Sequence, residues 1–587
     1  MKIKHYFGLA VIAAMTASCS SNEDLGNAGP GTGTNEAGVG YATFTINLPS
    51  TNGTRADGDP IYDQGTSDEY DVNDVALLIF KKAGKSEDDY TFVEKADLGN
   101  MAPWKAEGPN GITASATITA KLSKVALTSE GSTSDYYALA ILNNKNSAGK
   151  DKITLPTEST TESTTPPVTY GSWNAASNTD ETKLKDKGFY MANAPVFVAG
   201  KEPTTLVNID KVYATKQKAE TNAATTIHVE RGLAKVTVAS FPTGMTPTGT
   251  NYNSDQVDIT AWNLDVTNKS TFPIHKTTGL TSPFKTIWSA SSNPAPSTGR
   301  FVDGANKAFK RVYWGVDPNY DKNYTEVEDC DKEFNLLKAN AAITGDAATP
   351  QYCLENTFDI MHMLQGQTTR VVFKATYKPA SLPKGETTFY KIGNNTAIWS
   401  EENLKNQIKT VALTAMGITD VKEQAKYGVD LTKGTNISGK AGQHLITADN
   451  ITYSDEAASS EVKENVVKTI NEKLKTINEK LGLISTYLNG EAYYIARIKH
   501  FGNDLTPWNE GDETYGINNE DNNKKYLGRY GVLRNNWYEL IVNSVSGPGT
   551  PDVPKIKPTD SDDESYRYIS VSVKILSWAK RSQDVNL

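Results

Sequence analysis

The sequence predicts an all-β protein made of β-sandwich domains. Short segments of alternating apolar and polar residues recur along the chain, separated by polar loops rich in glycine, proline and asparagine. Alternation with a period of two is the pattern of a strand with one buried face, and many short strands favour a sandwich. At 587 residues the chain exceeds one hydrophobic core, so we expect two or more domains.

The expected strands extend over most of the chain: 41–48, 72–80, 114–122, 136–142, 189–191, 228–239, 257–266, 370–377, 492–498, 537–545 and 568–576. Two passages share an arrangement in which an opening strand is followed, after a loop, by a second strand. The first is "YATFTINLP" with "VNDVALLIF", and the second is "HVERGLAKVTV" with "VDITAWNLDV". We interpret them as the starts of two successive domains, with the boundary near residue 225.

One long amphipathic helix is predicted over residues 461–484. Its apolar residues follow a three/four spacing that makes one stripe: Val462, Val466, Ile470, Leu474, Ile477, Leu481 and Ile484. The heptads "TINEKLK" and "TINEKLG" repeat directly, which is compatible with a coiled-coil interface. Three heptads are short for a coiled coil, so an amphipathic helix that covers a sheet and ends at or soon after Gly482 is the preferred interpretation.

The start of the chain has the pattern of a secretion signal. Lys2 and Lys4 precede the apolar run 7–14, which is too short to span a bilayer. The run leads to Thr16-Ala17-Ser18-Cys19, which resembles the lipobox of bacterial lipoproteins, whose cysteine is lipidated. An ordinary signal peptide with an incidental Cys19 is the alternative. No later segment approaches eighteen apolar residues, so we expect membrane attachment through lipid alone.

Charge and motif content argue against a nucleic-acid partner and give no evidence for an enzyme. The net charge of -9 disfavours phosphate binding. "GTNISGKA" at 434–441 nearly matches a P-loop, but Ala441 replaces the hydroxyl that would bind magnesium. No two of the six histidines have the spacing of a zinc site, and the acidic turns 57–63 and 317–323 do not complete a calcium loop. We therefore expect no catalytic residues, metal or cofactor, and interpret the two turns as solvated loops.

Two cysteines remain after Cys19. Cys330 and Cys353 form an even pair in a chain with an export signal, so a disulfide is favoured. Two free thiols are the alternative.

The end of the chain carries a strand behind a linker. Residues 546–564 are rich in proline, glycine and acid, and in an extended form they reach on the order of 60 Å. The strand that follows places four apolar residues on one face: Ile569, Val571, Val573 and Ile575. This face must be buried, either by folding back onto its own domain or by pairing with the open edge of another molecule.

The first strand has the same pattern, with Ala42, Phe44, Ile46 and Leu48 on one face. It is followed by Arg55, the first Lys or Arg after Lys4. A protease that cuts after Arg55 would separate this strand from its domain and leave a groove worth roughly 1.5–3 kcal/mol per large side chain. The last strand of a neighbouring copy could fill it, and repeated head to tail this contact yields a fibre.

Several motifs resemble those of the Bacteroidales fimbrillins, most closely the Mfa-type major fimbrial subunits. They are the lipobox, "TRAD" around Arg55, "VERGLAKVTV", "YCLENT", "LRNNWYELIV" and the ending "ISVSVKILSWAKRSQDVNL". The resemblance implies two transthyretin-like β-sandwich domains with a few helices, and export as a lipoprotein. It also implies cleavage of the Arg55–Ala56 bond by a trypsin-like or Arg-specific surface protease. Polymerisation would proceed through an extended C-terminal donor strand that includes Leu576 and Trp578.

The predicted organisation follows from these features. We expect a signal peptide over residues 1–19, a propeptide with the removable strand over 20–55, and an N-terminal sandwich over 56–225. A C-terminal sandwich over 226–545, a linker over 546–565 and the donor strand over 566–587 complete the chain.

The predicted function is that of a non-enzymatic stalk subunit of an outer-membrane fimbria that supports adhesion and biofilm formation. Its expected partners are other copies of itself, accessory and anchor subunits, the processing protease, host or bacterial receptors, and the outer membrane through lipid. The alternatives are a tip or accessory fimbrillin or a surface glycan-binding lipoprotein that does not polymerise, and, less favoured, a hydrolase built on sandwich domains.

Overall fold

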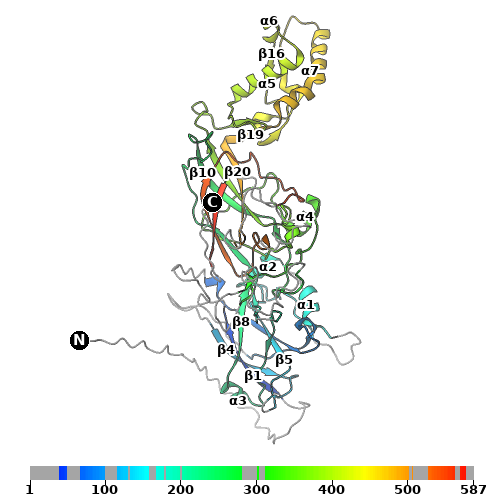
Figure 1. The fold of residues 1–587 in the computed structure, drawn as a ribbon, viewed down its shortest axis with the longest axis vertical. Coiled ribbons are helices and arrows are strands. Elements are labelled where there is room, and N and C mark those ends of the chain that lie inside the picture. Colours follow the sequence, from blue (N-terminus) through cyan, green and yellow to red (C-terminus); the bar gives the residue numbers. More distant parts are fainter. Residues whose placement is uncertain are drawn as a thin grey trace, which may run out of the picture.

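The computed structural model describes residues 39–48, 67–99, 115–129, 132–157, 167–176, 180–198, 201–280, 301–302, 311–501, 506, 526–561 and 569–576. Most regular elements are strands gathered into several sheets, so the predicted all-β class is confirmed. The molecule is elongated: a first sheet, a sandwich and a small helical lobe follow one another along its long axis (Figure 1). Among the described ranges, no helix combines the length and apolar character that crossing a bilayer requires.

The first sheet has the order β3-β2-β5-β6-β8-β1-β4, with β7 paired to β5. Its strands are β1 (Gly40–Asn47), β2 (Val75–Lys81), β3 (Thr91–Lys95), β4 (Ser115–Leu122), β5 (Tyr136–Leu142), β6 (Met191–Asn193), β7 (Val207–Asn208) and β8 (Thr225–Arg231). The sheet curls so that its two end strands, β3 and β4, come together. Asp97, just after β3, exchanges two backbone hydrogen bonds with Lys121 of β4. The curled sheet encloses an apolar core to which β1, β2, β4, β5 and β8 all contribute. We call this sheet with its core the first sandwich.

Two sheets face each other in the second sandwich, with the orders β13-β9-β21-β22 and β10-β14-β20. Their strands are β9 (Ala234–Val238), β10 (Gln256–Asp265), β13 (Gln351–Cys353), β14 (Arg370–Lys378), β20 (Glu491–Arg497), β21 (Trp537–Val545) and β22 (Ile569–Leu576). A short pair, β11 (Thr267–Asn268) and β12 (Phe334–Asn335), lies beside them. Buried residues from both sheets, including Trp262, Phe373 and Tyr538, form one core.

Residues 389–487, here called the helical lobe, are inserted between β14 and β20. The lobe contains β15 (Phe389–Ile392), α5 (Glu401–Met416), α6 (Val421–Gln424), β16 (Tyr427–Val429), β17 (Gly442–His444), β18 (Ile451–Tyr453), α7 (Ser460–Leu481) and β19 (Ile484–Tyr487). It has a core of its own and projects from the end of the second sandwich (Figure 1). The short α-helices elsewhere in the described part of the chain are α1 (Tyr170–Ala176), α2 (Glu181–Lys185), α3 (Lys216–Glu220) and α4 (Val327–Glu333).

Helix α7 forms where the periodicity predicts a helix. It begins after Ser459, whose side chain accepts a hydrogen bond from the Val462 amide, and it ends at Gly482, whose φ of 74° suits glycine. The helix packs along α5 and buries Ile470 and Ile477 in the lobe core. The expectation that it mainly covers a sheet is therefore wrong, because another helix of the same chain covers most of its apolar stripe.

The chain passes from the first sheet to the second at Gly232 and Leu233. The sequence predicts one strand over 228–239, but the structure has β8 up to Arg231 and β9 from Ala234, each in a different sheet. The chain has to change sheets here, and this breaks the predicted strand. We propose this step, which lies a few residues after the predicted position near residue 225, as the boundary between the domains.

Buried ion pairs join the two sandwiches around this step. Lys235 Nζ lies 2.9 Å from a carboxylate oxygen of Glu69, and both side chains are almost fully buried. Glu230 pairs with Arg311 at 2.7 Å and with His275 at 2.9 Å. We call these groups, together with the buried pair Glu355 and Arg534 at 3.1 Å, the junction cluster. Because each charge would be costly to bury alone, the cluster makes separation of the two sandwiches unfavourable.

Candidate strand-exchange site

Strand β1 lies in the interior of the first sheet, not at its edge. It pairs antiparallel with β4 over its whole length, from Gly40 opposite Leu122 to Asn47 opposite Ser115. On its other side it pairs parallel with β8, from Phe44 opposite Thr225 to Asn47 opposite His228. Removal of β1 would therefore open a gap between β4 and β8, which we call the acceptor groove.

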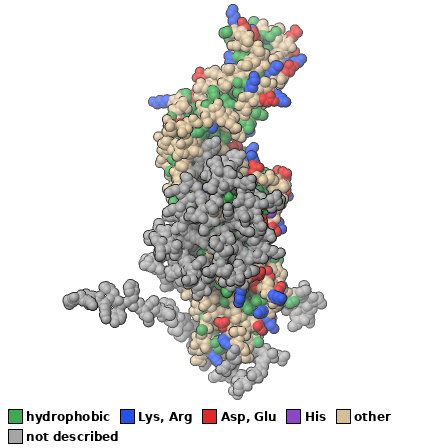
Figure 2. Space-filling model, in the orientation of Figure 1, with side chains coloured by type: hydrophobic (Ala, Val, Ile, Leu, Met, Phe, Trp, Pro, Cys, Tyr) green, Lys and Arg blue, Asp and Glu red, His purple; other side chains and the backbone are tan. Residues whose placement is uncertain are grey.

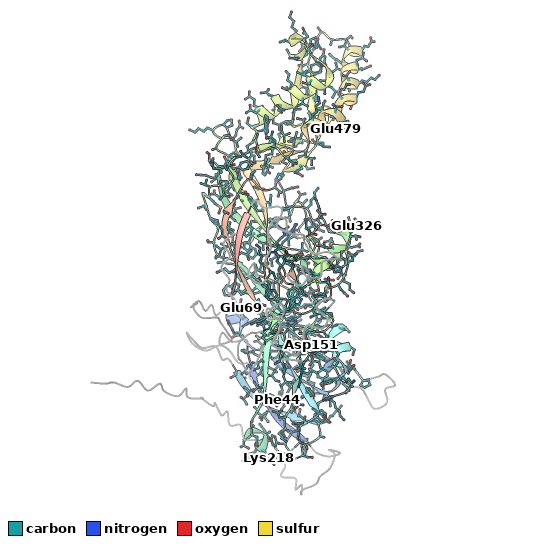
Figure 3. The ribbon with its side chains drawn as sticks, in the orientation of Figure 1. Phe44, Glu69, Asp151, Lys218, Glu326 and Glu479 are labelled. Atoms are coloured by element: carbon teal, nitrogen blue, oxygen red, sulfur yellow. The ribbon has the colours of Figure 1, made fainter. Side chains whose placement is uncertain are left out.

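The apolar face of β1 closes the core of the first sandwich. Ala42, Phe44, Ile46 and Leu48 are each at most 3 % exposed, and Phe44 lies deep in the lower part of the molecule (Figure 3). The alternate residues Tyr41, Thr45 and Asn47 are half-buried. Thr43, on the same outer face, is only 7 % exposed, so burial separates the two faces of β1 at every position except Thr43.

Polar contacts fix the register of β1 on its outer side. The hydroxyl groups of Thr43 and Thr119 lie 3.0 Å apart, and those of Thr45 and Thr117 lie 3.2 Å apart. Tyr41 also exchanges two backbone hydrogen bonds with Tyr213. Such pairs across neighbouring strands stabilise one register over a slipped one.

The predicted cleavage bond between Arg55 and Ala56 lies in residues 49–66, outside the described residues. The chain downstream of it is firmly held at Glu69, near the junction of the two sandwiches (Figure 3). Besides its ion pair with Lys235, Glu69 accepts a hydrogen bond of 2.6 Å from the Tyr352 hydroxyl, and its carbonyl accepts one from Arg231 Nε. A cut before this anchor would detach β1 alone. No sequence pattern singled out these anchoring residues, because their partners are 160 residues or more away.

Strand β22, the predicted donor strand, folds back onto its own chain. It pairs antiparallel with β21, from Ile569 opposite Val545 to Leu576 opposite Trp537. The sequence left two positions open for this strand, folded back onto its own domain or paired with another molecule. In the structure of the single chain it is folded back. Among the described strands, β22 is nevertheless the last of its sheet and has a partner on one side only. Trp578 lies outside the described residues.

The linker before β22 is not the loose tether that the sequence predicts. Thr550 exchanges two backbone hydrogen bonds with Tyr493, and the Tyr494 hydroxyl donates to the Gly547 carbonyl. The Arg370 side chain donates to the Pro554 carbonyl at 2.7 Å, and the backbone N–H of Gln365 donates to the Asp560 carbonyl at 2.9 Å. Proline and acid content suggested an extended chain in solvent, but carbonyl groups along 547–560 find donors on the second sandwich.

The two cysteines are free thiols in this structure, not the favoured disulfide. Cys353 belongs to the main core of the second sandwich, whereas Cys330 lies in a small separate cluster with Val266 and Phe334. Burial raises the pKa of the Cys330 thiol to about 11, and nearby Asp329 adds to this effect. Both side chains act as small apolar core residues here.

The acidic turn at 317–323 is a structural element rather than a solvated loop. Asp317 is 2 % exposed and accepts hydrogen bonds of 2.7 Å from the Thr357 amide and from the Asn268 side chain. Over the part of the chain that the structure describes, no three His, Cys, Asp or Glu side chains gather into a group that could hold a metal ion. The near P-loop at 434–441 contains a 3-10 turn and leads into β17, without the helix that a P-loop requires.

The comparisons with known proteins concern the C-terminal part and the fold. Residues 485–584 match the family model described as "Major fimbrial subunit protein type IV, Fimbrillin, C-terminal". No curated protein matches the chain.

Several solved structures are similar to the chain at low identity. A fimbrilin from Porphyromonas gingivalis has 11% identity and a TM-score of 0.33, over 92% of this chain and 99% of that one. A fimbrial assembly protein from Parabacteroides distasonis has 12% identity and a TM-score of 0.22, over 59% and 83%. The tip fimbrial protein Mfa3 from P. gingivalis has 10% identity and a TM-score of 0.21, over 59% and 83%.

The matched segment contains β20, β21 and β22, and it includes the ending that carries the resemblance in the sequence. The predicted family is thus confirmed at the level of the fimbrillins, whereas the Mfa-type assignment stays a prediction. Residues 485–584 are therefore similar to the C-terminal region of the fimbrillins, which supports the predicted relation to fimbrial subunits.

Proposed function

We propose that this chain is the stalk subunit of a surface fimbria and that it polymerises by strand exchange. In this proposal the precursor is exported as a lipoprotein through Cys19 and is cut between Arg55 and Ala56. The strand β1 then leaves, and β22 of a neighbouring copy occupies the acceptor groove. The observation that carries the proposal is the interior position of β1 between β4 and β8.

Burial explains why an empty acceptor groove would be filled. Phe44, Ile46 and Leu48 together bury apolar surface worth roughly 5–9 kcal/mol, at about 1.5–3 kcal/mol each. The groove also exposes two rows of backbone groups, on β4 and on β8, that pair with β1 in the precursor. A replacement strand recovers both contributions.

Strand β22 fits the groove by pattern and by position. Its residues 569, 571, 573 and 575 repeat the alternation of residues 42, 44, 46 and 48. At its present place it pairs with β21 alone, whereas in the groove it would have strands on both sides. Transfer therefore replaces one ladder of hydrogen bonds with two, which favours exchange once β1 has left.

The pinned linker limits how far β22 can travel. If the contacts along 547–560 persist, the stretch 562–568 can span at most about 23 Å, at roughly 3.3 Å per residue. The groove of the neighbouring copy must then lie close to the second sandwich. We therefore propose a fibre in which successive subunits are closely stacked.

Brief trypsin treatment of the purified precursor, followed by unboiled gel electrophoresis, tests the proposal. We expect a ladder of oligomers after cleavage, no ladder for Arg55→Ala, and no ladder for a chain that lacks residues 566–587. Lys475→Ala, which removes an exposed trypsin site on α7, controls for cuts elsewhere and should give the same ladder as the parent. A cut protein that retains β1 and stays monomeric would contradict the proposal.

A tip or accessory subunit, or a surface lipoprotein that binds glycans without polymerising, is the second candidate. The observation in its favour is that β22 and its linker are seated on their own chain. Such a subunit could accept a donor strand but would not give one. Oligomers that form only when another fimbrial subunit is added to the cut protein would identify it.

The proposal also implies the partners and the location of the protein. Copies of the same chain, accessory and anchor subunits, a surface protease, and host or bacterial receptors would be its partners at the outer membrane. Adhesion and biofilm formation would be properties of the fibre. The match of residues 485–584 to the fimbrillin model supports a structural protein rather than an enzyme.

A further inference from the structure

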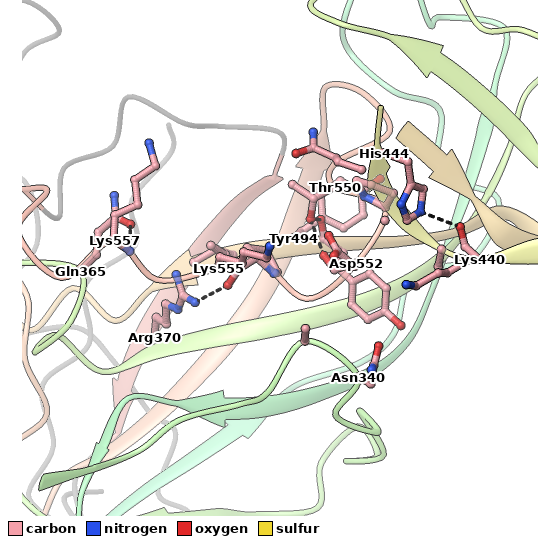
Figure 4. A pocket seen from close by; sticks show the side chains of 18 of the residues that line it. Asn340, Gln365, Arg370, Lys440, His444, Tyr494, Thr550, Asp552, Lys555 and Lys557 are labelled. Carbon is pink, nitrogen blue, oxygen red and sulfur yellow. Dashed lines mark hydrogen bonds between the residues drawn. The ribbon is translucent and has the colours of Figure 1, made fainter. Parts of the chain in front are cut away.

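A cavity of about 720 Å³ lies where the helical lobe, the second sandwich and the pinned linker meet. Figure 4 shows its walls: residues 440–444 of the lobe, the outer face of β20, and residues 550–557 of the linker. The volume is in the range of cavities that take small ligands. The proposed strand exchange does not use this cavity.

The lining of the cavity is rich in positive charge, although the chain as a whole has a net charge of -9. It contains one carboxyl group, that of Asp552, and these basic side chains: Arg370, Lys440, Arg497, Lys555 and Lys557. Arg370 is paired with Asp265 at 2.8 Å, and Lys557 is paired with Asp560 at 3.4 Å. Within the described residues, neither Lys440 nor Lys555 forms an ion pair. Burial raises the pKa of the Asp552 carboxyl, and the nearby charge of Lys555 opposes this effect. Lys440 and Lys555 are both exposed, so a ligand in the cavity can reach their charges.

The cavity also offers groups that recognise hydroxyl groups and sugar rings. Asn340, Gln365 and Gln443 bring side-chain amides to its walls, and the half-buried Tyr493 brings an aromatic ring. An amide donates to one hydroxyl group and accepts from another, while an aromatic face packs on apolar C–H groups. A saccharide that carries a carboxylate would use all three kinds of group.

An extended acidic peptide fits this site less well. Peptides bind sheets by adding a strand to a free edge, and β20 is an edge strand of its sheet. At Tyr493 this edge is already occupied, because both the amide and the carbonyl of Tyr493 are bonded to Thr550 of the linker. A ligand here must be recognised by side chains instead.

We propose that this cavity is a binding site for a carboxylated saccharide, in which Lys440 and Lys555 bind the carboxylate. The site joins the lobe to the linker, so a bound ligand would contact two segments that lie more than one hundred residues apart in the sequence. His444, whose ring nitrogen lies 3.1 Å from the Lys440 carbonyl, helps to fix the loop that carries Lys440.

Calorimetric titration of the uncut monomer with trigalacturonate tests this inference, with neutral galactotriose as the comparison. We expect saturable binding of the uronate, at least tenfold weaker binding of the neutral sugar, and weaker uronate binding at higher salt. The double variant Lys440→Gln/Lys555→Gln should lose at least tenfold in affinity. The matched double variant Lys332→Gln/Lys475→Gln has the same change in charge and replaces exposed lysines that do not line the cavity. It should bind like the parent.

Three outcomes would overturn the inference. They are no saturable uronate binding by the parent, equal losses in the two double variants, and equal binding of the charged and neutral sugars. Hexaglutamate that competes with the uronate at equal affinity would assign the site to acidic peptides instead. Unfolding temperatures equal to that of the parent would show that each variant is folded.

Discussion

Phe44 occupies the middle of the segment that the proposed cleavage would release. Its side chain is fully buried in the core of the first sandwich, and it is among the largest side chains in the protein with no exposure. The neighbouring Thr45 is half-buried and contacts Thr117 on the outer side of the sheet. Substitutions at Phe44 therefore test the core packing of β1, and substitutions at Thr45 test its contacts on the outer side of the sheet.

We expect Phe44→Ala to lower the free energy of unfolding of the uncut first sandwich by about 3–5 kcal/mol, through lost burial and the cavity left behind. Thr45→Ala should cost about 1 kcal/mol or less. Urea unfolding of both variants checks this. After cleavage, Phe44→Ala should also release β1 faster than the parent; release at the parent rate would show that this side chain does not hold the strand in its groove.

Glu230 makes the junction cluster sensitive to acid. Burial alone would raise the pKa of its carboxyl, but the positive charges of His275 and Arg311 and the hydrogen bond from His275 outweigh burial and lower the pKa from 4.5 to about 2. The ionised form is thus favoured in the folded protein. Its contribution to stability is complete above pH 4.5 and is lost as the pH falls from 4.5 through 2.

A pKa shift of this size corresponds to a contribution of about 3 kcal/mol to the free energy of unfolding. We expect Glu230→Gln to be less stable than the parent at pH 7 and to lose less stability between pH 4.5 and pH 3. Denaturant unfolding at several pH values measures the two slopes. Glu464→Gln, on the exposed face of α7, is the control and should keep the parent's slope; a parent-like slope for Glu230→Gln would show that other groups set the acid response.

At the scale of elements, β1 and β22 are a matched pair in different positions. β1 is an interior strand with two partners, and β22 is an edge strand with one. An edge strand can leave its sheet by breaking one ladder of hydrogen bonds, whereas an interior strand must break two. The proposed order of events, cleavage first and donation second, follows from this difference because the interior place must be vacated before it can be filled.

A disulfide across β21 and β22 should prevent donation. Ile541 and Ser572 are opposite each other in the pair, and opposite residues of antiparallel strands lie within the span of a disulfide. We expect the oxidised double variant Ile541→Cys/Ser572→Cys to be cut normally but to give no oligomer ladder. A reductant should restore the ladder in the same sample. A ladder from fully oxidised protein would mean that β22 need not leave β21.

The helical lobe has a hydrophobic core of its own. Its core is separate from that of the sandwich beneath it, and charged side chains of both signs cover its surface (Figure 2). Phe389 and Tyr487, stacked at 4.3 Å, root the lobe in the core of the second sandwich. These two rings tie the cavity wall at 440–444 to the sheet that carries β20.

At the scale of the whole molecule, the junction cluster joins the two sandwiches. One sandwich would lose β1 and the other would donate β22 in the proposed exchange. Lys235, Tyr352 and Arg231 all hold Glu69. In the proposed mechanism, this anchor follows the cleavage site and would keep the new start of the chain in place while β1 leaves. A rigid connection suits a subunit whose two ends engage different neighbours.

Cleavage should therefore leave the two sandwiches in the same relative position. We expect a chain without residues 566–587, which cannot donate a strand, to have the same radius of gyration before and after the cut at Arg55, within the error of small-angle X-ray scattering. The ion-pair variant Lys235→Met, which leaves Glu69 without its charged partner, should expand more on cutting. An equal and large expansion of both chains would show that β1 itself holds the sandwiches together.

Local alternation in the sequence was sufficient to predict the class of the fold, most of the long strands, and the two strands proposed to exchange. The range 136–142 coincides with β5, and 537–545 coincides with β21. The helix α7 and its end at Gly482 were also predictable, because periodicity and capping residues are local properties.

The sequence could not reveal which strands are neighbours. Periodicity shows that a face is buried but does not identify what covers it. Only the tertiary structure placed β1 between β4 and β8, seated β22 on β21, and pinned the linker along 547–560. It also separated Cys330 from Cys353 and brought Lys440 and Lys555 to one cavity. These contacts join residues that are far apart along the chain, and their geometry depends on how the whole chain packs.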